Sequence, residues 1–138
     1  MDKLIRNVKP VVGINPIYAT TGHATTATEV NATGYSRAMW VVSIGAMDAA
    51  AIVEVEVQES TTTSGTFAGV TSAALTDVTS AGANKVYLID HAVTPTKPYL
   101  KIAGTCGTAR ATVAAVCVLY EPNGLARPTH SAGQVISV

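Results

Sequence analysis

The sequence predicts an all-β protein, a single β-sandwich or jelly-roll-like domain of about seven to eight strands with extended N- and C-terminal arms. Short apolar runs recur at intervals of roughly ten residues and are separated by Gly, Pro and Asn. No window longer than a turn or two keeps the periodicity of an amphipathic helix. The 138 residues are 48% hydrophobic but only 5% aromatic, so the apolar mass comes from small and β-branched side chains, which suit pleated sheets.

A long apolar run spans residues 35–47, YSRAMWVVSIGAM. Its apolar side chains occupy both alternating faces around Trp40, and Asp48 ends the run. A strand covered on both faces shows this pattern, whereas a half-exposed strand alternates apolar and polar residues. We therefore expect residues 35–47 to form a central strand that is covered on both sides.

Within residues 52–59, IVEVEVQE, apolar and polar side chains alternate strictly from Val53 to Gln58. Successive side chains in a strand point to opposite faces, so one face carries valines and the other carries polar groups. The sequence predicts a half-buried strand here, with Val53, Val55 and Val57 on one face and Glu54, Glu56 and Gln58 on the other.

Turn signals divide the rest of the chain. Ser64 and Gly65 predict a turn, after which an extended segment begins near Phe67, and Gly82 with Asn84 marks the next turn. Three further strand-like runs follow, at residues 85–93, 97–105 and 109–122. These signals predict strands but not their order in a sheet.

The two ends of the chain differ from its middle, because prolines, glycines and weak patterning fill both. We expect an N-terminal arm or first strand at residues 1–34, a β-sandwich core at residues 35–121 and a C-terminal arm at residues 122–138. Apolar side chains in the two ends are candidate anchors for a partner. These candidate partner-binding residues are Leu4, Ile5, Val11, Val12, Ile14, Ile17, Tyr18, Val135, Ile136 and Val138.

Nine basic and nine acidic residues give a formal net charge of zero, and no run of Lys or Arg occurs. Nucleic acid is therefore not an expected partner. Charge this sparse gives little protection against association, which favours a homo-oligomer, with a trimer as one option. No apolar stretch approaches the length of a membrane span or a signal-peptide core, so we expect no membrane contact and synthesis in the cytoplasm.

Glu54 and Glu56 are the strongest candidates for a catalytic pair. They share one face of a strand with Cα atoms about 6.6 Å apart. Carboxyl groups about 6.5 to 9.5 Å apart can support inverting glycoside hydrolysis. That chemistry needs one carboxyl with a pKa raised by burial, whereas both glutamates occupy the polar face of a valine strand. We therefore interpret the pair as a solvated or interface-facing part of the strand.

The histidines and cysteines do not predict a metal site. His23, His91 and His130 lie in three separate regions, and the two cysteines are too few for a zinc site built on cysteine. We expect Cys117 to be a buried small apolar residue. Cys106 lies beside Gly107 in a predicted turn and should be more exposed, which leaves open whether the two cysteines pair. No cofactor is expected.

No serine sits in a nucleophile elbow, and no glycine-rich phosphate loop with its Lys is present. We therefore expect a protein that is not an enzyme. A glycan-binding β-sandwich would need exposed aromatic side chains, and the candidates Trp40, Tyr87, Tyr99 and Tyr120 all lie in apolar strands, which favours core packing.

The middle of the chain, over roughly residues 38–121, carries a further pattern. A hydrophobic strand with a glycine, AMWVVSIGAM, leads to a strand that ends in Gln58, Glu59 and Ser60. The run KPYLKIAGT then precedes an apolar final strand, ATVAAVCVLYEP. In these features the chain resembles small virion structural proteins of tailed bacteriophages, of the capsid decoration or head-stabilising (cement) type.

The resemblance implies a β-sandwich without catalytic residues that binds the major capsid protein and stabilises the capsid surface. Its expected location is the exterior of the virion capsid, after synthesis in the cytoplasm of a host bacterium. A neck or tail component is the first alternative, and a glycan-binding β-sandwich module is the second.

Overall fold

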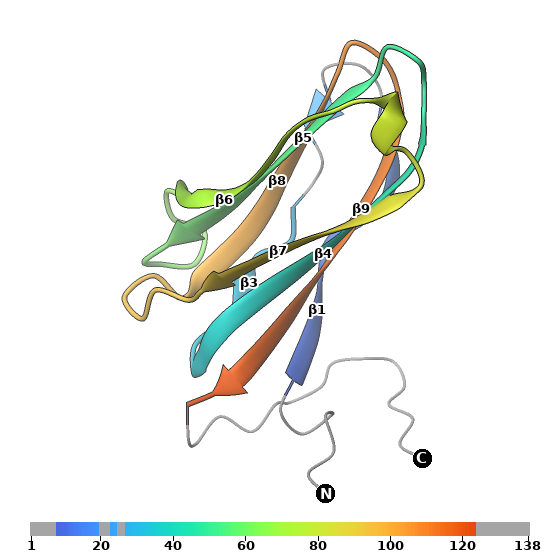
Figure 1. Cartoon of the computed structure of the whole chain (residues 1–138). Helices are drawn as coiled ribbons and strands as arrows, with labels where there is room; N and C mark the ends of the chain where they lie inside the picture. Colours follow the sequence, from blue (N-terminus) through green and yellow to red (C-terminus); the bar gives the residue numbers. More distant parts are fainter. Residues whose placement is uncertain (1–7, 20–22, 25–26, 124–138) are drawn as a thin grey trace, which may run out of the picture.

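The computed structural model describes residues 8–19, 23–24 and 27–123 and shows a sandwich of two antiparallel sheets (Figure 1). The first sheet contains, in spatial order, β1 (Val8–Ala19), β9 (Ala111–Pro122), β4 (Tyr35–Met47) and β7 (Lys85–Ala92). The second contains β2 (His23–Ala24), β8 (Tyr99–Gly107), β5 (Ile52–Ser60) and β6 (Ala68–Val78). The short strand β3 (Val30–Asn31) also pairs with β8.

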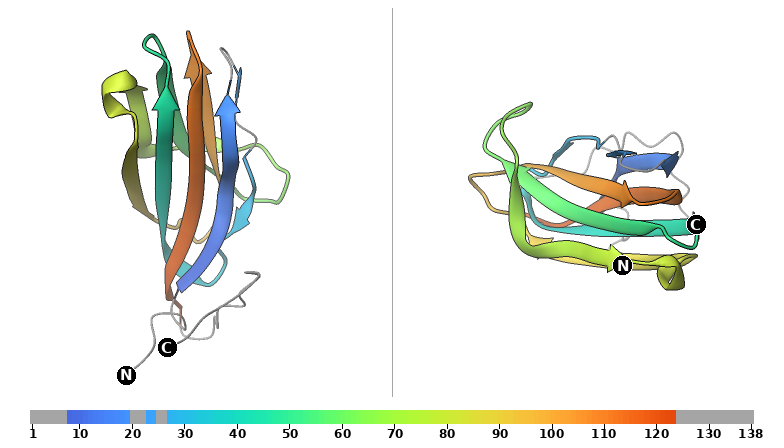
Figure 2. Two further views of the ribbon diagram at one scale, coloured as in Figure 1. Left: turned by 90° about the vertical axis from the view of Figure 1, so that its right-hand side faces the viewer. Right: turned by 90° about the horizontal axis from the view of Figure 1, so that it is seen from above.

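The connections between these strands follow the jelly-roll pattern. When β2 and β3 are counted as two pieces of one strand, each sheet has four strands, and every connection except the β5–β6 hairpin crosses from one sheet to the other. The two layers face each other in the right-hand view of Figure 2. The predicted fold class, an all-β sandwich or jelly roll with about seven to eight strands, is confirmed.

Helical structure is minimal in the described part of the chain. The 3-10 helix η2 (Ser80–Gly82) has three residues and precedes Asn84, which takes a positive φ of 56° at the predicted turn. Among the described residues, no helix has the length and apolar character needed to cross a membrane.

The core lies between the two sheets, and the alternation of β5 shows why. Val53, Val55 and Val57 are at most 1% exposed, while Glu54 and Glu56 on the opposite face are exposed. The predicted half-buried strand at residues 52–59 is therefore confirmed. β5 pairs with β8 on one side and β6 on the other, so it is an interior strand of its sheet.

Trp40 is the largest fully buried side chain of the core and comes from β4. Gly13 of β1 lies so close to it that a Cβ atom at this glycine would stand 2.6 Å from Cζ3 of Trp40. β1 can reach this position in the layer only because residue 13 has no side chain.

The prediction that residues 35–47 are covered on both faces is wrong for the described chain. The inward side chains of β4, among them Trp40, Val42 and Ile44, are buried, but the outward side chains Met39 and Val41 are only half-buried. No described segment crosses in front of the first sheet in the left-hand view of Figure 2. The described residues thus leave its apolar outer face uncovered.

The sequence predicts an arm or a first strand at residues 1–34, and the structure places a long strand there. Residues 8–19 form strand β1, which pairs with β9 from Val8↔Tyr120 to Ala19↔Ala111. Its register shifts on either side of Ile14, near Gly13 and Pro16. Residues 1–7 and 124–138 lie outside the described residues, so the structure says nothing of most of the expected C-terminal arm.

Cys106 does not lie in an exposed turn. It belongs to β8 and is 0% exposed, because its side chain points inward from the second sheet. Cys117 points inward from β9 and is also 0% exposed, and both thiols are free. Burial raises the pKa of both thiols, that of Cys117 to about 12.

Candidate interaction surface

The outer face of the first sheet carries one apolar side chain from each of its four strands in a single cross-strand row. Val12 of β1 pairs with Val116 of β9, Val116 with Val41 of β4, and Val41 with Leu88 of β7. Leu88 is 62% exposed, Val12 46% and Val116 39%, while Val41 is half-buried. We call these four residues the apolar row.

Apolar side chains also flank this row. Val86 lies two residues from Leu88 along β7, on the same face, and is 61% exposed. On the other side, Met39 of β4 pairs with Val118 of β9, and both are half-buried. We refer to the apolar row together with Val86, Met39 and Val118 as the apolar face.

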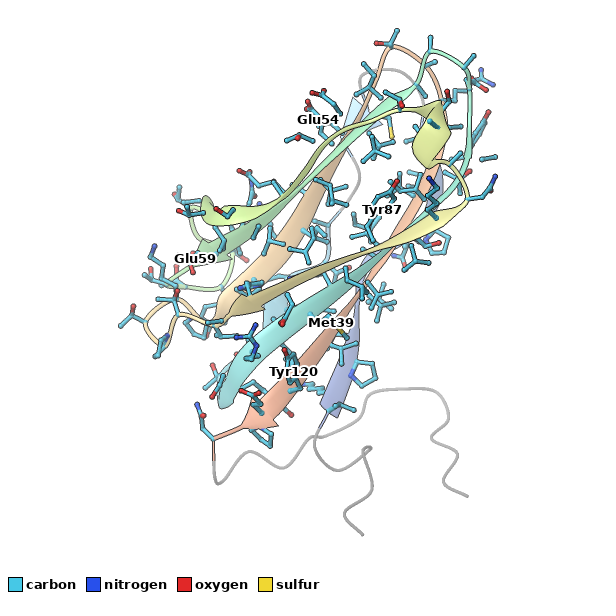
Figure 3. All side chains as sticks on the ribbon, viewed as in Figure 1. Met39, Glu54, Glu59, Tyr87 and Tyr120 are labelled. Carbon is cyan, nitrogen blue, oxygen red and sulfur yellow. The ribbon has the colours of Figure 1, made fainter. Side chains whose placement is uncertain are left out.

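A polar cluster closes one end of the apolar face. Nη2 of Arg37 donates to Oδ2 of Asp90 over 2.6 Å, and Nε of Arg37 donates to the hydroxyl of Tyr120 over 2.8 Å. The Tyr120 hydroxyl in turn donates to Oδ1 of Asp90 over 2.8 Å. Met39 and Tyr120 lie near one another along β4 and β9 in Figure 3. The cluster joins β4, β7 and β9 and carries no net charge.

This cluster fixes the charge state of Asp90. Partial burial acts to raise its pKa, but the hydrogen bonds from Arg37 and Tyr120 and the positive charge of Arg37 outweigh it, so the pKa of Asp90 is lowered. The ion pair therefore persists throughout the neutral range.

The candidate anchors predicted from the sequence are only partly available to a partner. Val12 and Tyr18 are exposed, and Val11 and Ile17 are half-buried against the core. Ile14 is 1% exposed and belongs to the core, so its proposal as an anchor is corrected. The remaining candidates, which lie outside the described residues, are Leu4, Ile5, Val135, Ile136 and Val138.

Three of the most exposed apolar residues, Val86, Leu88 and Val116, were missed by the sequence analysis. The sequence does contain a pattern that indicates apolar side chains on the outer face. Apolar side chains occupy both alternating faces in residues 35–47, 85–93 and 111–122. We expected cover on both faces only for residues 35–47, and the other two runs were predicted as strands without a statement on their cover. The structure shows that the second covering layer is absent from the described residues.

The outer face of the second sheet is polar, in contrast to the apolar outer face of the first sheet. Glu54, Glu56, Thr76 and Thr105 line an open groove of about 390 Å³ between β5, β6 and β8. Glu54 points away from the sandwich in Figure 3, and Glu56 accepts a hydrogen bond from Gln58 over 3.0 Å. This exposure agrees with a solvated pair of carboxylates. No three potential metal-ligating side chains of the described segments gather at one point.

The aromatic residues considered for glycan binding do not form a platform. Trp40 is fully buried, and Tyr87, Tyr99 and Tyr120 are half-buried. The Tyr87 hydroxyl donates to the carbonyl of Gly82 over 3.1 Å, which ties the side chain to the turn before β7.

His91 is the buried titratable group next to the core tryptophan. Its neighbour Asp90 points outward, as expected for adjacent strand residues, and His91 points inward with 9% exposure. Nε1 of Trp40 donates to Nε2 of His91 over 3.2 Å, so Nδ1 carries the proton and donates to the carbonyl of Ala92 over 3.0 Å. Burial lowers the pKa of His91, although Ala92, Asp90 and Glu59 oppose this.

Stability is therefore expected to fall as the solution is acidified. The unfolded chain binds a proton at His91 below about pH 6.5, while the folded chain resists protonation. The stabilising contribution is complete above this pH and is lost as the pH falls towards the lowered pKa of the folded state. We expect the melting temperature to drop by a few degrees between about pH 7.5 and pH 5.

The His91→Gln variant is the control for this effect. A glutamine can still accept from Trp40 but does not titrate, so its melting temperature should change less over the same range. Asp90 and Glu59 have lowered pKa values and act at more acidic pH. An undiminished pH dependence in His91→Gln would rule out His91 as its source.

No family model matches the chain, and no curated protein matches its sequence. Two solved structures superpose on most of this chain. "Structure of infectious bursal disease virus Gx strain" matches with a TM-score of 0.55 and 11% identity over 87% of this chain and 33% of that chain. "Crystal structure of infectious bursal disease virus VP2 subviral particle" matches with a TM-score of 0.58 and 9% identity over 85% of this chain and 33% of that chain.

A third structure, Eiger TNF from S. frugiperda, has a TM-score of 0.37 and 8% identity over 94% of this chain and 100% of that chain, an overlap too low to establish a shared fold. The chain spans about a third of the length of the two viral chains. These similarities show the fold, and this chain has the jelly-roll fold that is found in virus capsid proteins.

Proposed function

We propose that this chain is a non-enzymatic structural protein of a tailed-phage virion, which binds the major capsid protein and stabilises the capsid exterior as a decoration or cement protein. The observation that carries the proposal is the jelly-roll fold, shared with proteins of virus particles. The sequence pattern of residues 38–121 supports the narrower assignment to a phage virion.

The geometry of the two chain ends supports a role for them in capsid binding. Val8 pairs with Tyr120, so residues 1–7 and 124–138 are attached at the same end of the first sheet. These segments contain Leu4, Ile5, Val135, Ile136 and Val138. Five of the candidate anchors are thus carried by two segments that are attached at one end of the sandwich, which favours binding of both segments to the same capsid subunit.

Sedimentation with bare, mature capsids tests this function. The purified protein is mixed with shells, the shells are pelleted, and the copies that travel with them are counted on a gel. Saturable binding at a fixed ratio to the capsid subunit is the expected result. Association only with tails or isolated connectors would instead place the protein in the neck or tail.

Deletion of residues 1–7 should weaken capsid binding by on the order of tenfold or more, since it removes the apolar burial of Leu4 and Ile5. The matched control is Glu54→Gln with Glu56→Gln, which should leave binding nearly unchanged because both side chains are exposed on the second sheet. Equal binding by the deletion variant and the full chain would remove the N-terminal anchors from the proposal. A hydrolytic activity that is lost in Glu54→Gln would overturn the non-enzymatic assignment.

A further inference from the structure

We propose that the apolar face is the self-association surface of this protein, on which a second copy of the chain packs sheet against sheet around a two-fold axis. The proposal rests on the outer face of the first sheet and does not depend on capsid binding. It identifies which of the two sheets joins the copies and which is left to solvent or to other partners.

The first argument is the exposure of large apolar side chains. Leu88 and Val86 are 62% and 61% exposed and lie side by side on β7, and the apolar row continues from Leu88 across all four strands of the sheet. A monomeric protein rarely exposes a contiguous apolar patch larger than a few hundred Å². On the outer face of the first sheet, exposed apolar side chains run without interruption across all four strands.

The second argument is area. Four strands spaced about 4.8 Å apart and averaging roughly eleven residues, each rising about 3.3 Å, give the face a projected area of roughly 700 Å². A specific interface of standard size buries roughly 800 Å² on each partner. One sheet face is therefore large enough to hold two copies together, and two sheets can stack at about 10 Å with their apolar side chains interdigitating.

The third argument is charge, which favours a second copy over a charged partner. Arg37 and Asp90 neutralise each other at the end of the face, and the apolar row carries no charge. Nothing in this row selects an acidic or a basic surface, while two identical neutral faces meet without like-charge repulsion. The second sheet differs, because self-association there would bring the exposed Glu54 and Glu56 of two copies together.

The oligomeric state of the full chain tests the proposal. Light scattering on a sizing column should give twice the chain mass of 14.1 kDa. Leu88→Lys should raise the dissociation constant roughly a hundredfold or more and yield the monomer mass, because the substitution occurs twice in a two-fold interface. The side chain is largely exposed in the single chain, so far-UV circular dichroism should be unchanged.

The matched control is Thr105→Lys, which places the same charge on the exposed outer face of the second sheet and should remain a dimer. Val116→Cys provides an independent readout. Since Cys106 and Cys117 are buried, a bismaleimide should join two copies through the new thiol. The corresponding Thr105→Cys variant should not be joined.

Three results would overturn the proposal. The first is a wild-type chain that stays monomeric at high concentration. The second is a dimer that Leu88→Lys leaves intact while Thr105→Lys dissociates it. The third is a chain that dimerises only after removal of residues 124–138, which would identify that segment as the cover of the apolar face. Capsid sedimentation is measured separately, so failure here is distinguishable from failure of the proposed function.

Discussion

Replacement of Trp40 by alanine is expected to lower the free energy of unfolding by about 3–5 kcal/mol, the largest loss for any single substitution proposed for this protein. Trp40 is 0% exposed and is the largest of the fully buried side chains. Its removal leaves a cavity between the two sheets. It also leaves Nε2 of the buried His91 without the donor that now lies 3.2 Å away.

Urea unfolding followed by far-UV circular dichroism measures this loss. Tryptophan fluorescence cannot serve, because Trp40 is the single tryptophan of the chain. Thr105→Ala is the control, since its side chain is exposed on the second sheet, away from the apolar face, and should change the free energy of unfolding by well under 1 kcal/mol. Similar losses in both variants would mean that Trp40 is not at the centre of the core.

The second large effect is expected at Gly13. In Gly13→Ala the new Cβ atom would stand 2.6 Å from Cζ3 of Trp40 and 3.1 Å from Cγ2 of Ile102. Real Cβ atoms do not approach so closely, so β1 or the indole ring must move. We expect a loss of about 1–3 kcal/mol from overpacking, which exceeds the roughly 0.4–1 kcal/mol gained by restricting the unfolded chain.

Gly107→Ala is the matched control for Gly13→Ala. The nearest atom to a Cβ at Gly107 is the carbonyl oxygen of Ile52 at 3.9 Å, an ordinary contact. This variant should be neutral or slightly stabilising in the same urea experiment. In a Trp40→Ala background the loss of stability caused by Gly13→Ala should largely disappear, since the Trp40 ring atom that lies closest to the new Cβ atom is absent. Equal costs in both backgrounds would show that the strain at Gly13 has another source.

The local structure of this protein was predictable where one face of a strand is polar. The alternation in residues 52–59 predicted both the strand and the direction of each side chain, and Ser64 and Gly65 predicted the turn of the β5–β6 hairpin. The strand order was not predictable. The pairing of β1 with β9 joins residues from opposite ends of the chain, and no local signal encodes a contact at that separation.

The candidate surface was predictable only in part, for a related reason. Val12 was singled out as a partner-binding residue and lies in the apolar row, but Ile14, two residues further on, is buried. The register shift between Val12 and Ile14 turns their side chains to opposite faces of the sheet. Gly13 lies at this shift and packs against Trp40, a contact that the apolar pattern of residues 8–19 does not reveal. Apolar residues on both faces of a strand indicate two covering layers. They do not indicate whether the same chain supplies both.

The pairing of β1 with β9 also governs when the domain can fold during its synthesis. β9 lies between β1 and β4, so β1 has no neighbour in its sheet until residues 111–122 emerge, whereas β4 can already pair with β7. At roughly 5–20 residues per second the N-terminal half waits for several seconds with an unpaired, apolar strand. The first sheet is therefore completed only after residues 111–122 have been made, and a ribosome that stalls before β9 leaves a fragment prone to aggregation.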